Sequence, residues 1–386
     1  MKDSLSNNSV FSSSYWERAT FLQEYDVLII GSGIVGLNAA IRLKEESAAL
    51  KIGVLERGVL PNGASTKNAG FACFGSVSEL IEQQKKGSEE ELLKLVEFRW
   101  KGLETLTALL GKEAIRYQQL GGYELFDSSD RELFEACQEV IPYYNKLFKA
   151  VIGTTDIYAV SDAKIADFGF AKVQHLIENR CEAQIDTGRM MQALLLKAQS
   201  MGIIVINCIH IKQIEKDTYT RLIADGYTFA AKKVLIATNA FAQQLIPELD
   251  VVPGRGQVIV TQPIPNLKVK GTFHYDKGYY YFRNIDNRLL FGGGRNLDFT
   301  GEATYEQGFT DLVQNRLEQI ITEVILPGTK LEIDLRWSGI MGFGKELSPI
   351  LKKVDAGMYA AVRCNGMGVA MGSIMGRKAA EMLLND

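Results

Sequence analysis

The sequence has little of several features that would define a function class at once. Its 386 residues carry 43 Lys and Arg against 46 Asp and Glu, and no Lys/Arg block stands out. A nucleic-acid-binding surface needs an excess of positive charge, so DNA and RNA are not expected partners. No uncharged apolar run is long enough to span a bilayer, and the start, MKDSLSNNSVFSSSYW, lacks the apolar core of a signal peptide. We therefore expect a cytoplasmic protein without a transmembrane segment.

Cysteine and histidine are also scarce. They are scattered along the chain and form no CxxC pair: Cys73, Cys137, Cys181, Cys208, Cys364, His175, His210 and His274. This pattern is typical of reduced thiols and argues against a disulfide framework. No ligand spacing predicts a metal centre, which would require residues distant in the sequence to meet in the fold.

Length and composition indicate a globular chain with two domains, or with one domain interrupted by another, and we take two as the expected number. Hydrophobic residues make up 46% and charged residues 23% of the sequence, the balance of a folded protein. A chain of 386 residues is too long for one ordinary core, because chains of this size usually divide into domains.

A dinucleotide-binding fingerprint lies near the start of the chain. An apolar strand is predicted at 27–30, followed by GSGIVG at 31–36 and an apolar-striped helix. Gly31 permits the tight turn, Gly33 lets the backbone approach a pyrophosphate, and Gly36 allows close packing of the helix on the strand. A second strand ends at Glu56, 20 residues after Gly36. At this spacing an acidic side chain meets the ribose of the bound dinucleotide. Since Glu56 disfavours a 2′-phosphate, the site suits NAD or FAD better than NADP.

The stretch GASTKNAGFACFGS at 63–76 holds one charged side chain, Lys67. Small residues let a backbone lie close to a flat ligand. A flexible linker of this composition would be polar and monotonous, whereas Phe71, Cys73 and Phe74 indicate an ordered, packed segment. We expect it to run beneath the part of the cofactor that lies beyond the ribose.

Four segments resemble the D-amino-acid-oxidase-like FAD-dependent oxidoreductases, a family that includes glycine oxidase, sarcosine oxidase and γ-glutamylputrescine oxidase. ERGVLPNGASTKNAGF at 56–71 is similar to the family's segment after the acidic residue, and VLIATNAF at 234–241 to its strand beneath the cofactor. WSGIMGFGKELSPI at 337–350 and NGMGVAMGSIMGRKAAEMLL at 365–384 resemble its Trp-x-Gly segment and its closing glycine-rich turn and helix. The resemblance covers most of the chain and implies FAD as the cofactor.

The implied fold is mixed α/β and α+β. It has a discontinuous Rossmann-like FAD-binding domain, expected at 1–90, 172–250 and 335–386, and a second substrate domain built on a mainly antiparallel sheet, expected at 91–171 and 251–334. Turn signals at 276–278 and 286–287 predict hairpins in the second domain. A capping box of Ser88 and Glu91 predicts the start of a long helix that ends at Gly111.

The resemblance also implies which residues bind FAD. Sarcosine oxidases attach flavin to a cysteine in the segment equivalent to 337–349, and none is present here, so the FAD is expected to be noncovalent. The residues expected to contact FAD are Gly31, Ser32, Gly33, Ile34, Val35, Gly36, Glu56, Arg57, Ala64, Ser65, Lys67, Asn68, Ala69, Gly70, Ile211, Ala237, Thr238, Asn239, Gly339, Met341, Arg363, Asn365, Gly366, Met367, Gly368 and Val369. The turn at 365–368 opens a helix whose N–H groups could stabilise negative charge on the reduced ring.

The substrate-binding residues are less well defined. Met341 stands where glycine oxidase carries the arginine that holds the substrate carboxylate. Either the substrate is not a simple amino acid, or another arginine replaces it. The candidates are Arg283, Arg295, Arg336 and Arg363, and we favour Arg363 because it directly precedes the flavin turn. A surface salt bridge at a domain seam is the alternative role for Arg363.

Two tyrosines and one lysine complete the expected catalytic set. Tyr279 and Tyr281 share one face of a predicted strand and could line the substrate pocket, or could simply pack in the sheet. Sarcosine oxidases activate oxygen with a lysine at the position of Leu290. Lys67, which we expect beside the ring, could replace it or could only bridge polar groups.

The resemblance implies oxidation of the carbon–nitrogen bond of a small amine or amino-acid-like substrate, by hydride transfer to flavin N5. Oxygen is the favoured electron acceptor. One alternative is a dehydrogenase that passes electrons to a quinone or partner protein. Another is a flavin-binding redox sensor that uses Cys73 and Cys364 as thiol partners.

Overall fold

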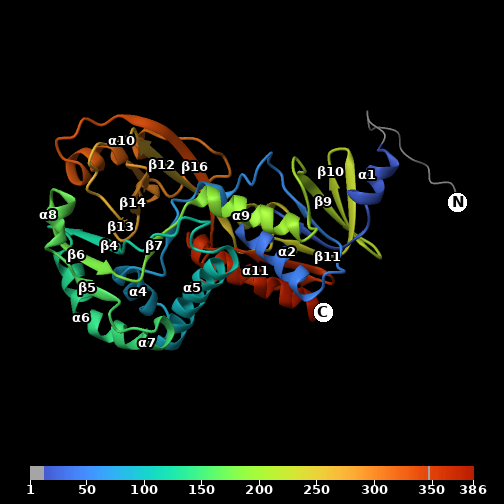
Figure 1. Ribbon diagram of the computed structural model, residues 1–386, viewed down its shortest axis with the longest axis horizontal. Helices are drawn as coiled ribbons and strands as arrows, with labels where there is room; N and C mark the ends of the chain where they lie inside the picture. The colour runs from blue at the N-terminus through green and yellow to red at the C-terminus, as the bar shows by residue number, and fades with distance from the viewer. Residues whose placement is uncertain (1–12, 347) are drawn as a thin grey trace.

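The computed structural model describes residues 13–346 and 348–386. Two sheets form the centres of two halves that lie side by side along the long axis of the molecule (Figure 1). The first half contains the amino-terminal strand and the carboxyl-terminal helix, and the second contains most of the middle of the chain.

The first sheet is mainly parallel. Its parallel strands, in spatial order, are β8 (Ile204–Ile206), β2 (Ile52–Leu55), β1 (Tyr25–Ile30), β11 (Tyr227–Ile236) and β18 (Met358–Val362). Antiparallel β17 (Ile350–Asp355) forms one edge, and β9 (Ile211–Lys216) and β10 (Thr220–Ala224) extend the start of β11. The carboxyl end of β1 lies between β2 and β11, where the chain crosses over, which is the usual ligand site of such a sheet.

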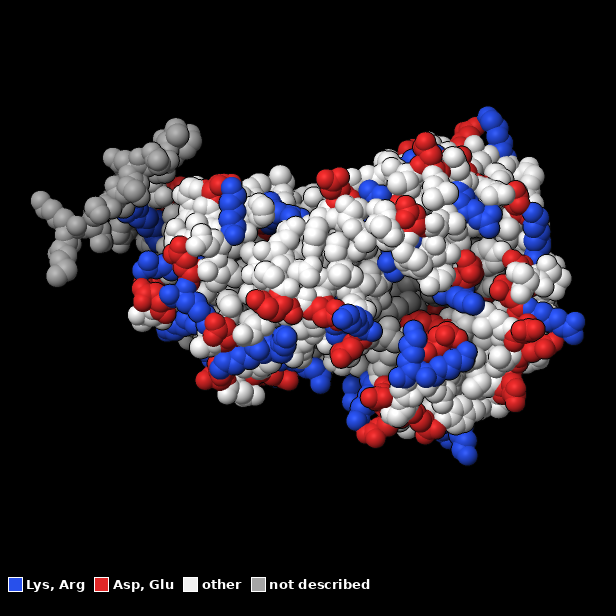
Figure 2. All heavy atoms as spheres, turned by 180° about the vertical axis from the view of Figure 1, so that it is seen from behind, with Lys and Arg blue, Asp and Glu red and all other residues white. Residues whose placement is uncertain are grey.

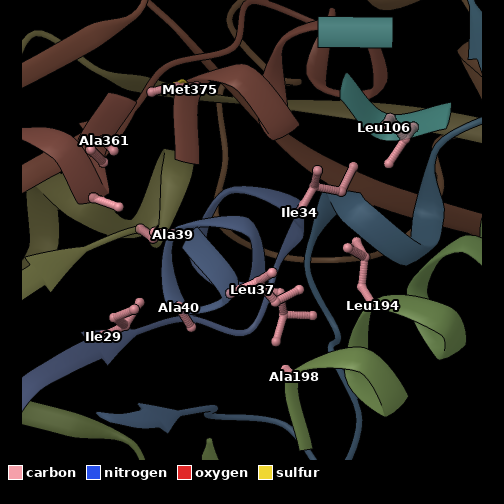
Figure 3. Close-up of a cluster of buried hydrophobic side chains, with 14 of the residues drawn as sticks. Ile29, Ile34, Leu37, Ala39, Ala40, Leu106, Leu194, Ala198, Ala361 and Met375 are labelled. Atoms are coloured by element: carbon pink, nitrogen blue, oxygen red, sulfur yellow. The ribbon is translucent and has the colours of Figure 1, made fainter. Parts of the chain in front are cut away.

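Four helices pack in and around this half: α2 (Ile34–Glu46), α9 (Thr187–Ser200), α11 (Gly368–Leu384) and α5 (Glu89–Leu110). Figure 3 shows the apolar core that they share, in which Leu37 of α2, Leu194 of α9 and Met375 of α11 are fully buried. The helices approach closely at glycines. A Cβ atom on Gly102 of α5 would lie 1.8 Å from the Ala370 carbonyl oxygen of α11, so only glycine fits there.

The second sheet has eight strands and is mainly antiparallel. They are, in spatial order, β16 (Ile333–Phe343), β12 (Val252–Thr261), β15 (Arg288–Gly293), β14 (Tyr280–Ile285), β13 (Thr272–Tyr275), β4 (Gly122–Asp127), β6 (Val173–Asn179) and β5 (Tyr158–Val160). The predicted hairpins are confirmed. Asp286 and Asn287 join β14 to β15 with φ values of 45° and 58°, the left-handed pair that a tight hairpin needs.

Helical segments cover the second sheet. Its core packs against α10 (Asp311–Ile320) and the π-helix η3 (Ile321–Ile325), while α4 (Val77–Gln84) and α6 (Arg131–Leu147) enclose a neighbouring cluster. The remaining short elements are α1 (Tyr15–Thr20), α3 (Ala64–Lys67), β3 (Phe71–Ala72), α7 (Lys149–Ile152), α8 (Lys164–Phe168), β7 (Ala183–Gln184), η1 (Asn239–Gln244) and η2 (Arg295–Leu297).

The structure shifts three of the expected domain boundaries. β6 lies in the second sheet, although residues from 172 onward were expected in the FAD-binding domain. β16 pairs with β12 over its whole length, so residues 335–343 also belong to the second sheet. α5, expected in the substrate domain, packs on α11 of the first half. Its predicted capping box is confirmed, and its last turn ends at Gly111 with φ of 80°.

Two observations on the sequence, the lack of a Lys/Arg block and the lack of a long apolar run, can be compared with the structure. Figure 2 shows Lys and Arg interspersed with Asp and Glu over the visible face. Among residues 13–346 and 348–386, no helix combines the length and apolar character needed to cross a membrane.

Candidate functional site

A cavity of about 750 Å³ opens at the carboxyl end of β1 and continues beneath the second sheet. This volume is typical of cofactor sites. Most of the residues singled out in the sequence line it: Gly31, Gly33, Ile34, Val35, Glu56, Arg57, Ala64, Ser65, Lys67, Asn68, Ala69, Gly70, Ile211, Ala237, Thr238, Asn239, Tyr279, Tyr281, Gly339, Met341, Asn365, Gly366, Met367, Gly368 and Val369. Ser32, Gly36 and Arg363 do not line it.

The glycine turn shapes the end of the cavity beside β1. Gly31 has φ of 104°, and a Cβ atom on it would lie 2.9 Å from the Ala237 carbonyl oxygen. Gly33 caps α2, so the positive end of that helix points toward the cavity. Gly36 acts through packing, since a Cβ atom there would lie 2.0 Å from the Gly31 carbonyl oxygen. Gly36 therefore shapes the turn without lining the cavity.

Glu56 is the acidic group of this end and is held in one orientation. Its Oε2 accepts hydrogen bonds from the Ser32 N–H at 3.1 Å and from the Ser32 hydroxyl at 2.7 Å, and its Oε1 accepts one from the Gly58 N–H at 2.8 Å. Ser32 is fully buried. Ser32 therefore positions Glu56 and does not itself line the cavity.

The small-residue stretch that follows Gly63 forms an ordered wall of the cavity. Ser65 Oγ accepts a hydrogen bond from the Ile34 N–H at the start of α2, at 3.0 Å. Asn68 donates to the carbonyl oxygens of Ala64 and Ser65, at 3.1 and 3.0 Å. These contacts place bare backbone along the cavity, as the sequence predicts, and they exclude a flexible linker.

Arg283 and Trp337 hold the same wall from the second sheet. The Arg283 Nη1 donates to the carbonyl oxygens of Ala69, Gly70 and Ile185 at 2.7 to 3.1 Å. Burial lowers the pKa of Arg283 to about 10. The Trp337 indole N–H donates to the Lys67 carbonyl oxygen at 2.9 Å. The Arg283 guanidinium is thus used to hold the small-residue wall, and the residue does not line the cavity where a substrate would bind.

The second sheet forms the roof of the other end. Tyr281 lines the cavity and Tyr280 is buried in the core on the opposite face, so the predicted alternation is confirmed. Tyr279 also lines the cavity but precedes β14 rather than lying within it. Burial raises the pKa of Tyr281 to about 12, so its phenol stays neutral at ordinary pH.

Arg363, our favoured carboxylate partner, points away from the cavity. Its guanidinium donates to Asp250, to Glu346 and to the Ser348 carbonyl oxygen, at 2.7 to 3.3 Å, and the residue is 3% exposed. Its backbone has φ of 68°, which directs the side chain to this network. Arg363 thus forms ion pairs with Asp250 and Glu346, as the alternative predicts, but it is buried rather than at the surface, and it is not placed to bind a substrate in the cavity.

Of the four candidate arginines, Arg295 is the one that lines the cavity. Its guanidinium carbon lies 4.1 Å from the Phe343 ring centroid and 4.9 Å from that of Phe299. The nearby Glu302 is taken by Arg255, whose Nε and Nη2 lie 2.7 and 3.0 Å from its carboxylate oxygens. No carboxylate of residues 13–346 or 348–386 forms an ion pair with Arg295. Arg336, the fourth candidate, instead pairs with Glu318 of α10.

Several cavity residues carry no signal in the sequence. Ser76, Glu79 and His274 line the cavity beside Cys73, yet they belong to no motif and meet only in the fold. Ser76 caps α4, three residues before Glu79. The register of β13 against β14 brings His274 opposite Tyr281. Only knowledge of this pairing would have identified His274.

The lining residues fit FAD. The bare glycine turn and the amino end of α2 suit a pyrophosphate, and Glu56 suits a ribose. At the other end, the turn formed by Asn365 and Gly366 lines the cavity immediately before α11, so a second helix start faces it. Such N–H groups stabilise negative charge on a reduced ring.

The comparison with known families decides between NAD and FAD. The profile of the FAD dependent oxidoreductase family matches residues 26–382. The chain belongs to this family. As a member of the FAD dependent oxidoreductases it is an enzyme, and its fold and the FAD dependence of its family agree with the expectations from the sequence.

Individual relatives of this FAD dependent oxidoreductase are distant. It is 22% identical over 393 residues to the probable oxidoreductase OrdL of Haemophilus influenzae, covering 95% of this chain and 84% of OrdL. Glycine oxidase from Geobacillus kaustophilus has a similar structure, with a TM-score of 0.76 and 19% identity over 94% of this chain and 95% of that one. L-proline dehydrogenase from P. horikoshii gives a TM-score of 0.74 and 18% identity, with 94% of each chain covered.

Proposed function

We propose that this protein oxidises the carbon–nitrogen bond of a small amino-acid-like substrate that carries a carboxylate, with noncovalently bound FAD. The observation that carries the proposal is Arg295, a half-buried guanidinium that lines the cavity beneath the second sheet without an ionic partner among the described residues. Burial lowers the pKa of Arg295, yet arginine remains charged at neutral pH. A half-buried cation without an ionic partner favours an anionic ligand.

The substrate would lie between the roof and the small-residue wall. Arg295 would hold its carboxylate, and Phe343 would support the guanidinium from one side. Tyr281 offers a neutral phenol that can donate a hydrogen bond to the substrate. Met341, in place of the arginine of glycine oxidase, leaves the wall near Gly256 apolar, with its methyl carbon 2.9 Å from the Cβ position of that glycine. Arg295, which follows the end of β15, would thus supply the positive charge that Met341 lacks.

The chemistry that bound FAD supplies is acceptance of a hydride equivalent at N5 from the carbon beside the substrate nitrogen. The chain contributes orientation, exclusion of water and electrostatic stabilisation. The N–H groups before α11 would stabilise negative charge, and Glu56 with the start of α2 would hold the nucleotide. We infer noncovalent attachment because the segment at 337–349 contains no cysteine.

Oxygen is the acceptor that we propose, with Lys67 as the activating charge. Lys67 lines the cavity, and no carboxylate in the described part of the chain forms an ion pair with it. Leu290, at the position of the family's oxygen-activating lysine, is buried in an apolar cluster with Ala69 and Val258. A positive charge beside the reduced ring would therefore come from the wall below it rather than from β15.

A turnover assay tests this proposal. The FAD-loaded protein would be supplied with a panel of amino acids, N-substituted glycines and simple amines, in parallel with oxygen and with a redox dye. The proposal predicts oxygen consumption, hydrogen peroxide and a carbonyl product with a carboxylate-bearing amine. Turnover with the dye alone would identify a dehydrogenase, and turnover of simple amines in preference to every carboxylate-bearing compound would overturn the role of Arg295.

A further inference from the structure

A second group of polar side chains lies at the edge of the cavity, outside the parts assigned to FAD and to the substrate carboxylate. Cys73, Glu182 and His274 each offer one donor atom, and these atoms all lie within 4.8 Å of one another. Cys73 is 6% exposed and Glu182 1% exposed. Sulfur, oxygen and nitrogen donors that meet in this way match the atom types that bind zinc in proteins.

The geometry of His274 is not explained by hydrogen bonding. Its Nε2 is buried and has no hydrogen-bond partner among the described residues. It lies 3.9 Å from Glu182 Oε2, beyond hydrogen-bond distance. Two atoms that each lie about 2.0–2.2 Å from one zinc ion are at most about 4.4 Å apart, so one ion between them can contact both.

Glu182 is held in place for this contact. Its Oε1 accepts a hydrogen bond from the Phe74 N–H at 3.3 Å. A Cβ atom on Gly122 would lie 1.9 Å from Glu182 Oε2, so the carboxylate occupies space that only glycine leaves open. Support of a ligand by neighbouring groups in this way is typical of metal sites.

The charges around the group leave room for a cation. Arg99 is already paired with Glu79, 3.0 Å away. Glu124 lies nearby and accepts hydrogen bonds from Ser78. The site is therefore negative on balance, which favours a bound cation.

We propose that Cys73, Glu182 and His274 bind a divalent metal ion of the zinc type. Three protein ligands leave one position of a tetrahedral ion open. Cys73 and His274 line the cavity, so the open position faces it and can take water or an oxygen of a bound substrate. The site does not depend on which compound the enzyme oxidises.

Zinc binding to the FAD-loaded protein tests this site without an activity assay. The protein is stripped with a chelator, equilibrated with zinc and dialysed, its zinc content is measured by mass spectrometry, and its affinity by competition with a chromophoric chelator. We expect one zinc ion per chain. Cys73→Ser and His274→Ala should each lower the affinity at least about tenfold, and Gly122→Ala should do the same by displacing Glu182.

Two matched variants control for adventitious binding. Cys208 is exposed and His210 lines the far end of the cavity, so Cys208→Ser and His210→Ala should hold zinc as the parent does. The flavin spectrum reports that each variant is folded. A folded parent that holds no zinc after dialysis, or zinc that Cys73→Ser and His274→Ala retain at parental affinity, would overturn the proposal.

Discussion

Replacing Arg295 with leucine should separate recognition of the carboxylate from the rest of catalysis. The guanidinium lies over the Phe343 ring and is partly withdrawn from water, so a substrate carboxylate there would form charge-assisted hydrogen bonds. Each such interaction contributes about 1.5–3 kcal/mol. Its loss corresponds to a decrease in kcat/KM of about 10- to 150-fold.

The assay compares an amino acid with the amine that lacks its carboxylate. Arg295→Leu should reduce kcat/KM for the amino acid and leave that for the amine nearly unchanged, because only the amino acid contacts Arg295. Arg295→Lys keeps the positive charge but loses the planar guanidinium that can bind a carboxylate with two N–H groups, so its decrease in kcat/KM should be smaller. Arg336→Met, outside the cavity, is the control. Equal losses for both substrates in Arg295→Leu would refute the assignment, as would no loss for the amino acid.

Three further predictions concern the other parts of the site. Gly36→Ala should destabilise the fold by at least about 1–3 kcal/mol and weaken FAD binding, because its Cβ atom would meet the Gly31 carbonyl oxygen at 2.0 Å. Gly188→Ala is the control, since its Cβ atom would lie 3.5 Å from its nearest neighbour. Thermal unfolding and FAD titration should show a loss of stability and affinity for Gly36→Ala and none for Gly188→Ala. Lys67→Met should slow reoxidation of the reduced enzyme by oxygen at least about tenfold while leaving the anaerobic half-reaction largely intact, and an unchanged stopped-flow reoxidation rate would contradict this role. Burial raises the pKa of Tyr281 to about 12, so its phenol loses its proton at a higher pH than a free tyrosine, whose pKa is about 10. Any decrease of kcat/KM with rising pH below pH ~11 should therefore persist in Tyr281→Phe. Loss of that decrease in the variant would show that Tyr281 titrates in this range.

The end of the cavity beside β1 could be predicted because its residues lie close together in the sequence. The three glycines and Glu56 follow one another within one strand–helix–strand unit, and the small-residue stretch follows directly. The hairpin at Asp286 and Asn287 was predictable for the same reason, since its turn residues adopt left-handed backbone.

The remaining parts depend on contacts between distant segments. Whether β6 and β16 join the first or the second sheet is decided by their pairing partners, which no local pattern specifies. Arg363 precedes the expected turn, but Asp250 and Ser348 determine where its side chain points. Cys73, Glu182 and His274 are each separated by about a hundred residues, so their cluster exists only in the fold.

Anaerobic mixing of the FAD-loaded protein with a carboxylate-bearing amine tests the central claim most directly. The account predicts that the visible flavin absorbance bleaches without oxygen and that one equivalent of the carbonyl product appears after hydrolysis of the imine. A yellow protein whose flavin no amine or amino acid reduces would contradict the proposed oxidation of a carbon–nitrogen bond. A protein that cannot be loaded with FAD at all would contradict the assignment of the cavity.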